Sequence, residues 1–444
     1  MDQQMVDKLE AYIEGQVGVD GFNGTVLVSQ SGRCLLSKGW GFANREHLAL
    51  NHSETKFRIG SISKLFTAAG ILLLQEQGKL SVNDKLNRFI SDYPNGDKIT
   101  IHHLLTHTSG IPNFTNFIEY RSISRLFSPP ESTLTQFKTL PLDFDPGDRF
   151  FYSNSGYILL ARIVELISEA NFSDFLDNSI FKPLEMHNTG NDCYDTVLPH
   201  RASGYKVWGD YVHADFIDMS IMTGAGGLYS TVEDLFLWDK AFYSGAILSE
   251  SSRKSMMTPH VLVNGTTSYG YGLNISNNVL FKNSLQTHKM IGLSGGIDGF
   301  MCEYQRFIND DLMIVVMSNV HPSQPAVILN DLARIVLGEY VPIVQKPQFI
   351  SVDYTLYPIY SGRYSTSNKK FNPVITVEGG NLYISYEPWY KYELKPIKQL
   401  GNDRTSLFRT VGAAGELTFF HDEFGRVSKG EFNLFEKVIN LLPD

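Results

Sequence analysis

A serine and a lysine, Ser61 and Lys64, stand three residues apart and could together form an acyl-transfer centre. Apolar side chains recur at helical spacing through residues 65–73, which predicts a helix. Positions three apart on a helix are neighbours, so the hydroxyl and the amine would share one face. A serine hydroxyl is a weak nucleophile until a base removes its proton, and a lysine with a lowered pKa can act as that base.

Two other interpretations of this pair remain open. Ser63 directly precedes Lys64, but adjacent helical residues face different directions, which favours Ser61. Ser61 also follows Gly60 at the predicted start of the helix, where free backbone N–H groups and the helix dipole favour a developing negative charge. The second interpretation is a chance match, in which the lysine is a solvated surface residue.

A second pair of polar residues, Tyr152 and Asn154, precedes another predicted helix over residues 158–167. Residues two apart in extended backbone point the same way, so both side chains could face one cleft. A tyrosine near a lysine ammonium loses its proton more easily and can serve as a general base. An asparagine amide can orient a substrate carbonyl or the lysine. The alternative is that Asn154 or Ser155 only caps the helix.

A third segment, residues 292–300, is rich in glycine. A glycine-rich strand permits close approach of a ligand to the backbone, and its N–H groups can hold an oxyanion. The alternative is a plain turn or bulge.

The elements that must position these residues can be predicted from periodicity and turn signals. Residues 80–189 are predicted to be mostly helical, and Thr231 is predicted to cap a helix. Strands and a last helix are expected at residues 24–29, 34–41, 300–308, 312–319 and 325–337.

The composition changes near residue 340. Residues 341–350 contain Pro342 and Pro347 and are predicted to be a linker. From about residue 351 to 444 the chain consists of short segments rich in tyrosine and phenylalanine, which predicts a small antiparallel β domain and makes a barrel one form that it could take. The predicted domains are therefore residues 1–340 and 351–444.

Bulk properties exclude several classes of protein. The chain has 444 residues and a formal net charge of −9, without a basic block, so nucleic acid is not an expected partner. An apolar run of about 18 residues, as a membrane span needs, is absent from the sequence. Cys34, Cys193 and Cys302 lie too far apart to indicate a disulfide framework or a thiolate metal site.

Residues 1–14 lack the basic and then apolar layout of a secretory signal. We therefore expect a cytoplasmic protein, or an extracytoplasmic one whose leader has been removed.

Taken in order, the three motifs resemble those of the serine β-lactamase and penicillin-binding-protein superfamily, and most closely its class C β-lactamase-like members. That group includes D-Ala-D-Ala carboxypeptidases, D-aminopeptidases and esterases. The resemblance covers about residues 5–340 and extends to four further segments: residues 22–27, 99–112, 225–235 and 269–273. The tail is similar to the β-barrel appendage of some members, including the penicillin-binding protein 4* group.

The resemblance implies an α/β sandwich, in which an antiparallel sheet is flanked by helices, with an all-helical insertion at about residues 80–190. It also implies roles for individual residues. Ser61 would be the acylated nucleophile, Lys64 would accept or relay its proton, and Tyr152 would be the base that later activates water. Asn154, Ser294 and Gly295 would contact the substrate, and the backbone N–H groups of Ser61 and Gly296 would form an oxyanion hole. The expected partner is a small-molecule or peptide substrate, with no metal or organic cofactor.

One position departs from the pattern. The third motif of the family usually opens with lysine or histidine, whereas this chain has Leu293. Leucine cannot attract the carboxylate that penicillins and D-Ala-D-Ala peptides carry, which removes about 1.5–3 kcal/mol of binding. His288 or Lys289 nearby could compensate.

Three rival hypotheses remain. Residues 292–296 also fit G-x-S-x-G, which would make Ser294 the nucleophile of an α/β-hydrolase. His103 and His107 are four apart, a metal-ligand spacing, although the acid of H-E-x-x-H is missing. The third hypothesis is a penicillin-binding or sensor protein that is acylated without efficient turnover.

Overall fold

The computed structural model describes residues 3–281, 286–343, 347–367, 372–386, 390–400, 402–412, 415–434 and 437–443. Residues 344–346 of the predicted linker lie outside this range.

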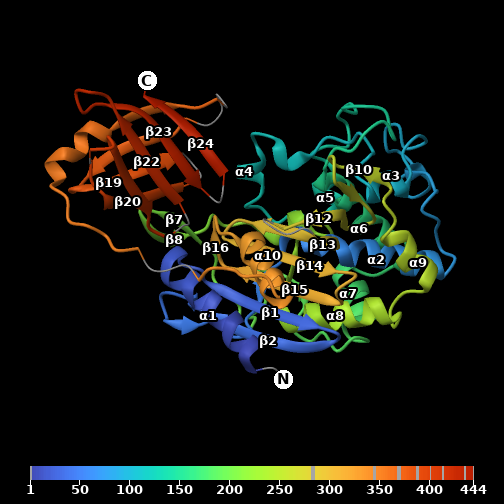
Figure 1. Ribbon diagram of the computed structural model, residues 1–444. Coiled ribbons are helices and arrows are strands. Elements are labelled where there is room, and N and C mark those ends of the chain that lie inside the picture. The colour runs from blue at the N-terminus through green and yellow to red at the C-terminus, as the bar shows by residue number, and fades with distance from the viewer. Residues whose placement is uncertain are drawn as a thin grey trace.

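An eight-stranded antiparallel sheet forms the centre of the first part of the chain (Figure 1). Its order is β10-β11-β12-β13-β14-β15-β1-β2. The strands are β1 (Gly24–Gln30), β2 (Arg33–Trp40), β10 (Val261–Leu262), β11 (Thr267–Tyr269), β12 (Asn274–Leu280), β13 (Thr287–Ile297), β14 (Phe300–Phe307) and β15 (Leu312–Ser318). Ser31 and Gly32 form the turn of the β1–β2 hairpin, and both residues have positive φ.

Helices cover both faces of this sheet. On one face, Val26, Val28 and Ile314 pack with residues of α1 (Gln3–Asp20) and α10 (Pro325–Val336). On the other face, Leu27 and Val315 pack with a larger cluster that contains α2 (Ser63–Glu76) and α8 (Val232–Ser244). Alternate side chains of β15 therefore enter two different cores, which explains why its sequence is apolar throughout.

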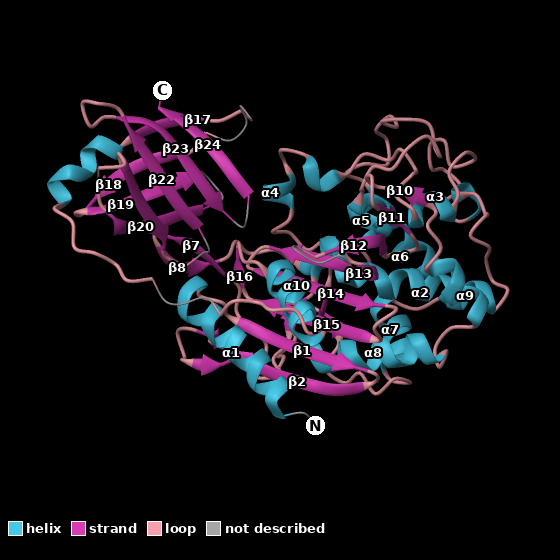
Figure 2. Cartoon of the chain, in the orientation of Figure 1, coloured by secondary structure: helices cyan, strands magenta, loops and turns pink. Residues whose placement is uncertain are grey.

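Residues 80–189 form helices and loops, as predicted. The helices of this segment are η2 (Leu86–Arg88), α3 (Ile101–Leu105), η3 (Phe114–Asn116), α4 (Tyr120–Ile123), α5 (Pro130–Leu134), α6 (Asn154–Ser168), α7 (Phe172–Leu176) and η4 (Asp177–Phe181). Helices α6 and α7 pack against α2, and α3 packs against α6, which brings the second motif towards the first (Figure 2). The fold class expected from the sequence, an α/β sandwich with a helical insertion, is confirmed.

The C-terminal part is a closed antiparallel barrel of eight strands, in the order β20-β19-β18-β17-β24-β23-β22-β21, with β21 pairing back to β20. The strands are β17 (Gly362–Ser365), β18 (Val374–Glu378), β19 (Asn381–Tyr386), β20 (Tyr390–Lys398), β21 (Thr405–Thr410), β22 (Gly415–His421), β23 (Val427–Leu434) and β24 (Lys437–Pro443). Alternate positions such as Tyr392, Leu394, Phe408 and Phe419 fill the interior. The period-two pattern of tyrosine and phenylalanine in the sequence follows from this arrangement.

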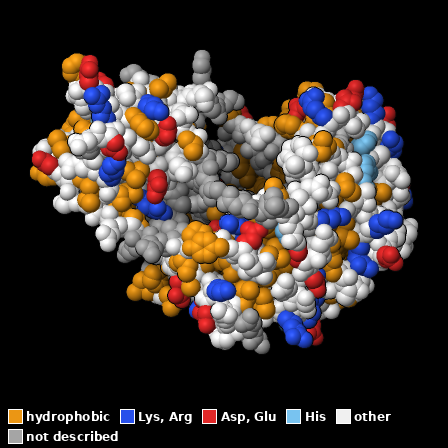
Figure 3. All heavy atoms as spheres, viewed as in Figure 1, with side chains coloured by type: hydrophobic (Ala, Val, Ile, Leu, Met, Phe, Trp, Pro, Cys, Tyr) orange, Lys and Arg blue, Asp and Glu red, His pale blue; other side chains and the backbone are white. Residues whose placement is uncertain are grey.

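The barrel is attached to the first part through strand pairing. The short strand β7 (Tyr205–Trp208) pairs with β8 (Asp210–His213), with β16 (Val320–His321) and, at Trp208, with Lys391 of β20. Tyr205, Val207 and Val320 belong to the same buried cluster as the barrel interior. The surface is hollowed between the barrel and the helical part of the chain (Figure 3).

The remaining named strands are β3 (Phe42–Asn44), β4 (Ala49–Leu50), β5 (Phe57–Arg58), β6 (Gly190–Asn191) and β9 (Leu228–Ser230). The other helices are η1 (Gly60–Ile62), η5 (Met219–Met222), α9 (Glu250–Met256) and η6 (Tyr354–Tyr360). Among the described residues, no helix is long and apolar enough to span a membrane.

Candidate active site

Ser61 lies on a tight turn at the start of a buried helix. Strand β5 ends at Arg58, Gly60 has a left-handed φ of +51°, and Ser61 sits in η1 directly before α2. The glycine reverses the chain so that the serine hydroxyl is only half-buried while its helix is covered on nearly all sides.

Lys64 is completely buried in the first turn of α2, with its amine directed at the serine. Lys64 Nζ lies 3.2 Å from Ser61 Oγ, 2.8 Å from Asn154 Oδ1 and 2.6 Å from the carbonyl oxygen of Ala225. Burial lowers the pKa of Lys64 well below the ordinary lysine value. The solvated-surface interpretation of this lysine is therefore wrong.

These contacts indicate where the protons lie. A neutral amine has two N–H donors and one lone pair, and the carbonyl oxygens of Asn154 and Ala225 can only accept. When they take the two N–H groups, the lone pair is left for the hydroxyl proton of Ser61. The lowered pKa of Lys64 favours this neutral state.

Tyr152 completes the contacts of the serine hydroxyl. Its phenolic oxygen is 2.6 Å from Ser61 Oγ, and Lys64 Nζ is 4.9 Å from the centre of its ring. Burial raises the pKa of Tyr152 to about 12, and the hydrogen bond to Ser61 opposes this only in part. The direction of this shift is opposite to the sequence-based expectation of an easily ionised tyrosine, because burial of the phenol disfavours its charged form. As a phenol, Tyr152 donates to Ser61 Oγ, which leaves the serine proton for Lys64.

Asn154 is the first residue of α6 and does not cap it, because the N-cap position is Ser153. Its Oδ1 accepts from Lys64, and its Nδ2 donates to Thr115 Oγ1 at 3.1 Å. Asn113 accepts from the backbone N–H of Asn154 at 3.0 Å and from the Thr115 hydroxyl at 3.0 Å. The loop at residues 113–115 thus fixes the amide that orients the lysine, a role that the sequence did not reveal.

His107 forms the wall behind Tyr152, with ring centres 4.4 Å apart. Its Nδ1 accepts from the N–H of Ser153 at 3.2 Å, so its proton is on Nε2, which is 3.2 Å from the Tyr269 hydroxyl. Burial, with the Lys64 charge second, lowers the pKa of His107 well below its ordinary value. His107 is therefore a neutral residue that holds the tyrosine loop in place. The signals in the sequence were the family-like segment at residues 99–112 and the spacing of four residues from His103, which suggested a metal site instead.

Strand β13 lies directly against the Ser61 turn. A Cβ atom on Gly295 would meet the carbonyl oxygen of Ile59 at 1.9 Å, and one on Gly60 would meet the N atom of Gly296 at 2.7 Å. Among the described residues, β12 pairs with β13 only as far as Gly292, so residues 293–297 have a strand on one side only and present a free edge. The Ser61 turn is therefore in close contact with Gly296, and the oxyanion hole formed by the backbone N–H groups of Ser61 and Gly296 stays a prediction.

Replacing Gly60 by alanine should damage this contact. The added Cβ would both strain a left-handed φ and strike Gly296, and we expect a loss of about 2–5 kcal/mol of folding stability together with a large loss of acylation rate. Gly78 is a matched control, since it has a φ of +70° but nothing within 4 Å of its added Cβ; its alanine variant should lose only about 1–2 kcal/mol. Equal denaturation midpoints for the two variants would contradict the close approach of β13.

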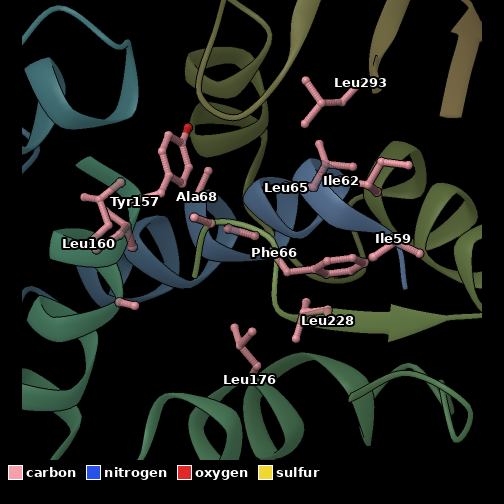
Figure 4. Packing of buried hydrophobic residues seen from close by; sticks show 14 of the residues in the cluster. Ile59, Ile62, Leu65, Phe66, Ala68, Tyr157, Leu160, Leu176, Leu228 and Leu293 are labelled. Carbon is pink, nitrogen blue, oxygen red and sulfur yellow. The ribbon is translucent and has the colours of Figure 1, made fainter. Parts of the chain in front are cut away.

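Leu293 is a buried apolar residue on the strand next to the Ser61 turn. It is buried in the cluster that contains Ile62 and Leu65 (Figure 4). Neither proposed substitute replaces it, because His288 is buried beside Asp310 with Nδ1 2.8 Å from Oδ2. Lys289 is four positions from Leu293 on an extended strand, about 13 Å away. The strand geometry therefore excludes the compensation that was left open by the sequence.

The structure also bears on two rival hypotheses, the Ser294 nucleophile and the histidine metal site. Ser294 is exposed and opposite Glu303 on a β strand, with no helix after it, so the strand–serine–helix turn of an α/β-hydrolase is not formed. His103 caps α3 through the N–H of Thr100, while His107 lies behind Tyr152. In the described part of the chain, no group of three or more metal-ligating side chains could hold an ion.

Comparisons with known proteins agree with this geometry. The sequence model of the family described as Beta-lactamase matches residues 9–338. Penicillin-binding protein 4* of Bacillus subtilis is 30% identical over 396 residues, which cover 84% of this chain and 86% of that protein. The octameric penicillin-binding protein homologue from Pyrococcus abyssi is similar over 99% of this chain and 100% of its own, with 25% identity and a TM-score of 0.67. A penicillin-binding protein from Bacillus halodurans covers 74% of this chain and 98% of its own, with 28% identity and a TM-score of 0.63. The chain therefore belongs to the Beta-lactamase family of serine acylating hydrolases.

Proposed function

We propose that this protein hydrolyses amides or esters whose leaving group carries no carboxylate, through an acyl-enzyme on Ser61. The observation that carries the proposal is the set of contacts around Lys64. The buried amine of Lys64 donates to two carbonyl oxygens, and its lone pair is directed at Ser61 Oγ.

In acylation, Lys64 takes the proton of Ser61 as the oxygen attacks the substrate carbonyl. The developing oxyanion lies between the N–H groups of Ser61 and Gly296, which stabilise charge best when they are fixed in advance. Tyr152 passes its phenolic proton to the leaving group. The product of this step is an ester on Ser61, a charged Lys64 and a phenolate on Tyr152.

In deacylation the same groups reverse their roles. The phenolate of Tyr152 takes a proton from the attacking water, and Lys64 returns its proton to the departing serine oxygen. The short distance between Lys64 and the Tyr152 ring, 4.9 Å to its centre, lets the ammonium stabilise the phenolate while both are charged. Every proton removed in acylation is thus returned, and no metal or cofactor is required.

The substrate class follows from Leu293. Its side chain packs into the core, and no cation stands in the position where the family usually has one. A carboxylate on the leaving-group side would lose a charge-assisted contact there. Penicillins and D-Ala-D-Ala peptides are therefore expected to be weaker substrates than neutral esters or amino-acid amides.

A substrate panel tests the proposal. Nitrocefin, p-nitrophenyl acetate, D-Ala-p-nitroanilide and a D-Ala-D-Ala peptide would be compared by kcat/KM, with mass spectrometry of the intact protein to detect the acyl-enzyme. We expect neutral esters or amides to be turned over more efficiently than nitrocefin. Labelling by a fluorescent penicillin that never dissociates, without turnover of any other substrate, would instead favour a penicillin-binding or sensor protein.

Restoring a cation at position 293 should shift this preference. We expect Leu293→His to raise the kcat/KM ratio of nitrocefin to p-nitrophenyl acetate by about 10- to 150-fold, the value of one charge-assisted hydrogen bond. Leu293→Met is the matched control, because it keeps an apolar side chain of similar volume. An unchanged ratio in a histidine variant that remains folded by circular dichroism would refute the role given to this position.

A further inference from the structure

A cavity of about 340 Å³ opens beside the catalytic residues, on the side of Asn154. Three parts of the chain line it. Thr115 and Tyr120 come from the helical insertion, Asp298 and Gly299 from the turn between β13 and β14, and Lys206 and His321 from strands β7 and β16, which join the barrel. Thr115, in the wall of the cavity, accepts a hydrogen bond from Asn154 at 3.1 Å, so the cavity directly adjoins the site already described.

This cavity lies on the side of the acyl group. The leaving group has to reach the proton of Tyr152, whereas the cavity adjoins Asn154 through Thr115. Along β13, Leu293 is three residues before Gly296, and Asp298 is two residues after it. The two positions therefore lie on opposite sides of Gly296 along the chain, with Asp298 in the turn directly after β13.

The charged side chains that line the cavity differ in whether they form ion pairs. Arg121 and Lys206 both contact Asp215, with N–O distances of 2.9 and 3.4 Å. Asp298, among the residues that the structure describes, has neither a hydrogen bond nor an ion pair, and His321, Asp215, Lys206 and Arg121 act on its charge only from a distance. Partial burial raises the pKa of Asp298, and its charge in turn contributes, after burial, to raising the pKa of Tyr120.

We propose that Asp298 binds a cationic group on the acyl part of the substrate, such as the α-ammonium of an amino-acid amide. This deepens the proposed function and rests on it, because the acyl side is defined by attack from Ser61. A partly buried carboxylate that has no close partner is stabilised when a cation binds beside it. The two lining cations already share a carboxylate, which makes an anionic acyl group the weaker alternative.

The test separates binding from catalysis. Full-length Ser61→Ala protein would be titrated with D-alaninamide, propionamide and succinamic acid by ligand-observed NMR. These ligands share a primary amide, and their acyl parts are cationic, neutral and anionic. We expect D-alaninamide to bind at least about tenfold more tightly than propionamide. Adding Asp298→Asn should reduce this ratio towards one, whereas Asp97→Asn, at an exposed loop carboxylate, should leave it as it was.

Kinetics on otherwise native protein give the second readout. The ratio of kcat/KM for D-alanine p-nitroanilide over propionic acid p-nitroanilide should fall by about 10- to 150-fold in Asp298→Asn, since the ratio cancels effects on the shared chemistry. Asp298→Glu keeps the charge and should retain part of the preference.

Each outcome has one meaning. Equal binding of the cationic and neutral amides, or tighter binding of succinamic acid, would overturn the assignment, and the latter would point to Arg121 and Lys206. If native protein cleaved neither anilide while the Asp298-dependent preference in binding persisted, the proposed function would fail and the cation site would stand.

Discussion

Replacing Ser61 by alanine is expected to reduce turnover of every substrate by about 10³- to 10⁶-fold, because the acyl group then has no oxygen on which to form. The measurement is kcat/KM for the best substrate of the panel, together with the mass of the intact protein after mixing. Native protein should gain the mass of the acyl group, and the variant should gain none.

Ser63 and Ser294 provide matched controls for this experiment. The Ser63 hydroxyl is buried and accepts a hydrogen bond from the N–H of Leu228 at 3.1 Å, so Ser63→Ala should cost about 1–3 kcal/mol of stability and little activity. Ser294→Ala should still be acylated. Loss of acylation in Ser294→Ala, with full activity in Ser61→Ala, would move the nucleophile to the glycine-rich strand and refute the assignment.

Replacing Lys64 is expected to have the second largest effect. Lys64→Ala removes the group that takes the serine proton and should lower kcat/KM by about 10²- to 10⁴-fold, as is typical of a lost general base. Lys64→Arg should fail to a similar degree, because a guanidinium keeps its charge and has no lone pair to offer. An arginine variant with near-native activity would show that the position needs only a positive charge.

The pH profile gives an independent check on Lys64. Burial lowers its pKa well below the ordinary lysine value, so the neutral base is available on the alkaline side of that lowered value and is lost as the pH falls through it. The acidic limb of kcat/KM should therefore lie below the pKa of a solvated lysine, and it should be absent from the residual activity of Lys64→Ala. The same limb in both proteins would assign it to another group.

Much of the fold could be predicted from local patterns. The β1–β2 hairpin, the strand pair β14–β15, the Thr231 cap of α8 and the final helix α10 lie within one or two residues of their predicted bounds. Each is decided by neighbouring residues through apolar periodicity, a turn or a cap. The strands β7 and β16 were not predicted, because a short strand is stabilised by the partner it meets, and that partner is distant in sequence.

For the candidate site too, some features could be predicted from the sequence and others could not. The sequence by itself determined which chemistry the chain carries, because Ser61, Lys64, Tyr152 and Asn154 stand in motifs whose order identifies the family; the individual roles stay predictions until the variants are measured. It also determined that Leu293 lacks the usual cation.

Only the tertiary structure decided the protonation states and the surroundings. Three features depend on segments more than forty residues apart in sequence: the burial of Lys64 against Ala225, the neutral His107 behind Tyr152, and Asp298, which has no close partner among the described residues. A pKa is set by desolvation and by the groups that packing brings near, and these act through space rather than along the chain. The residue types therefore fixed the available chemistry, whereas the packing decided which group holds each proton.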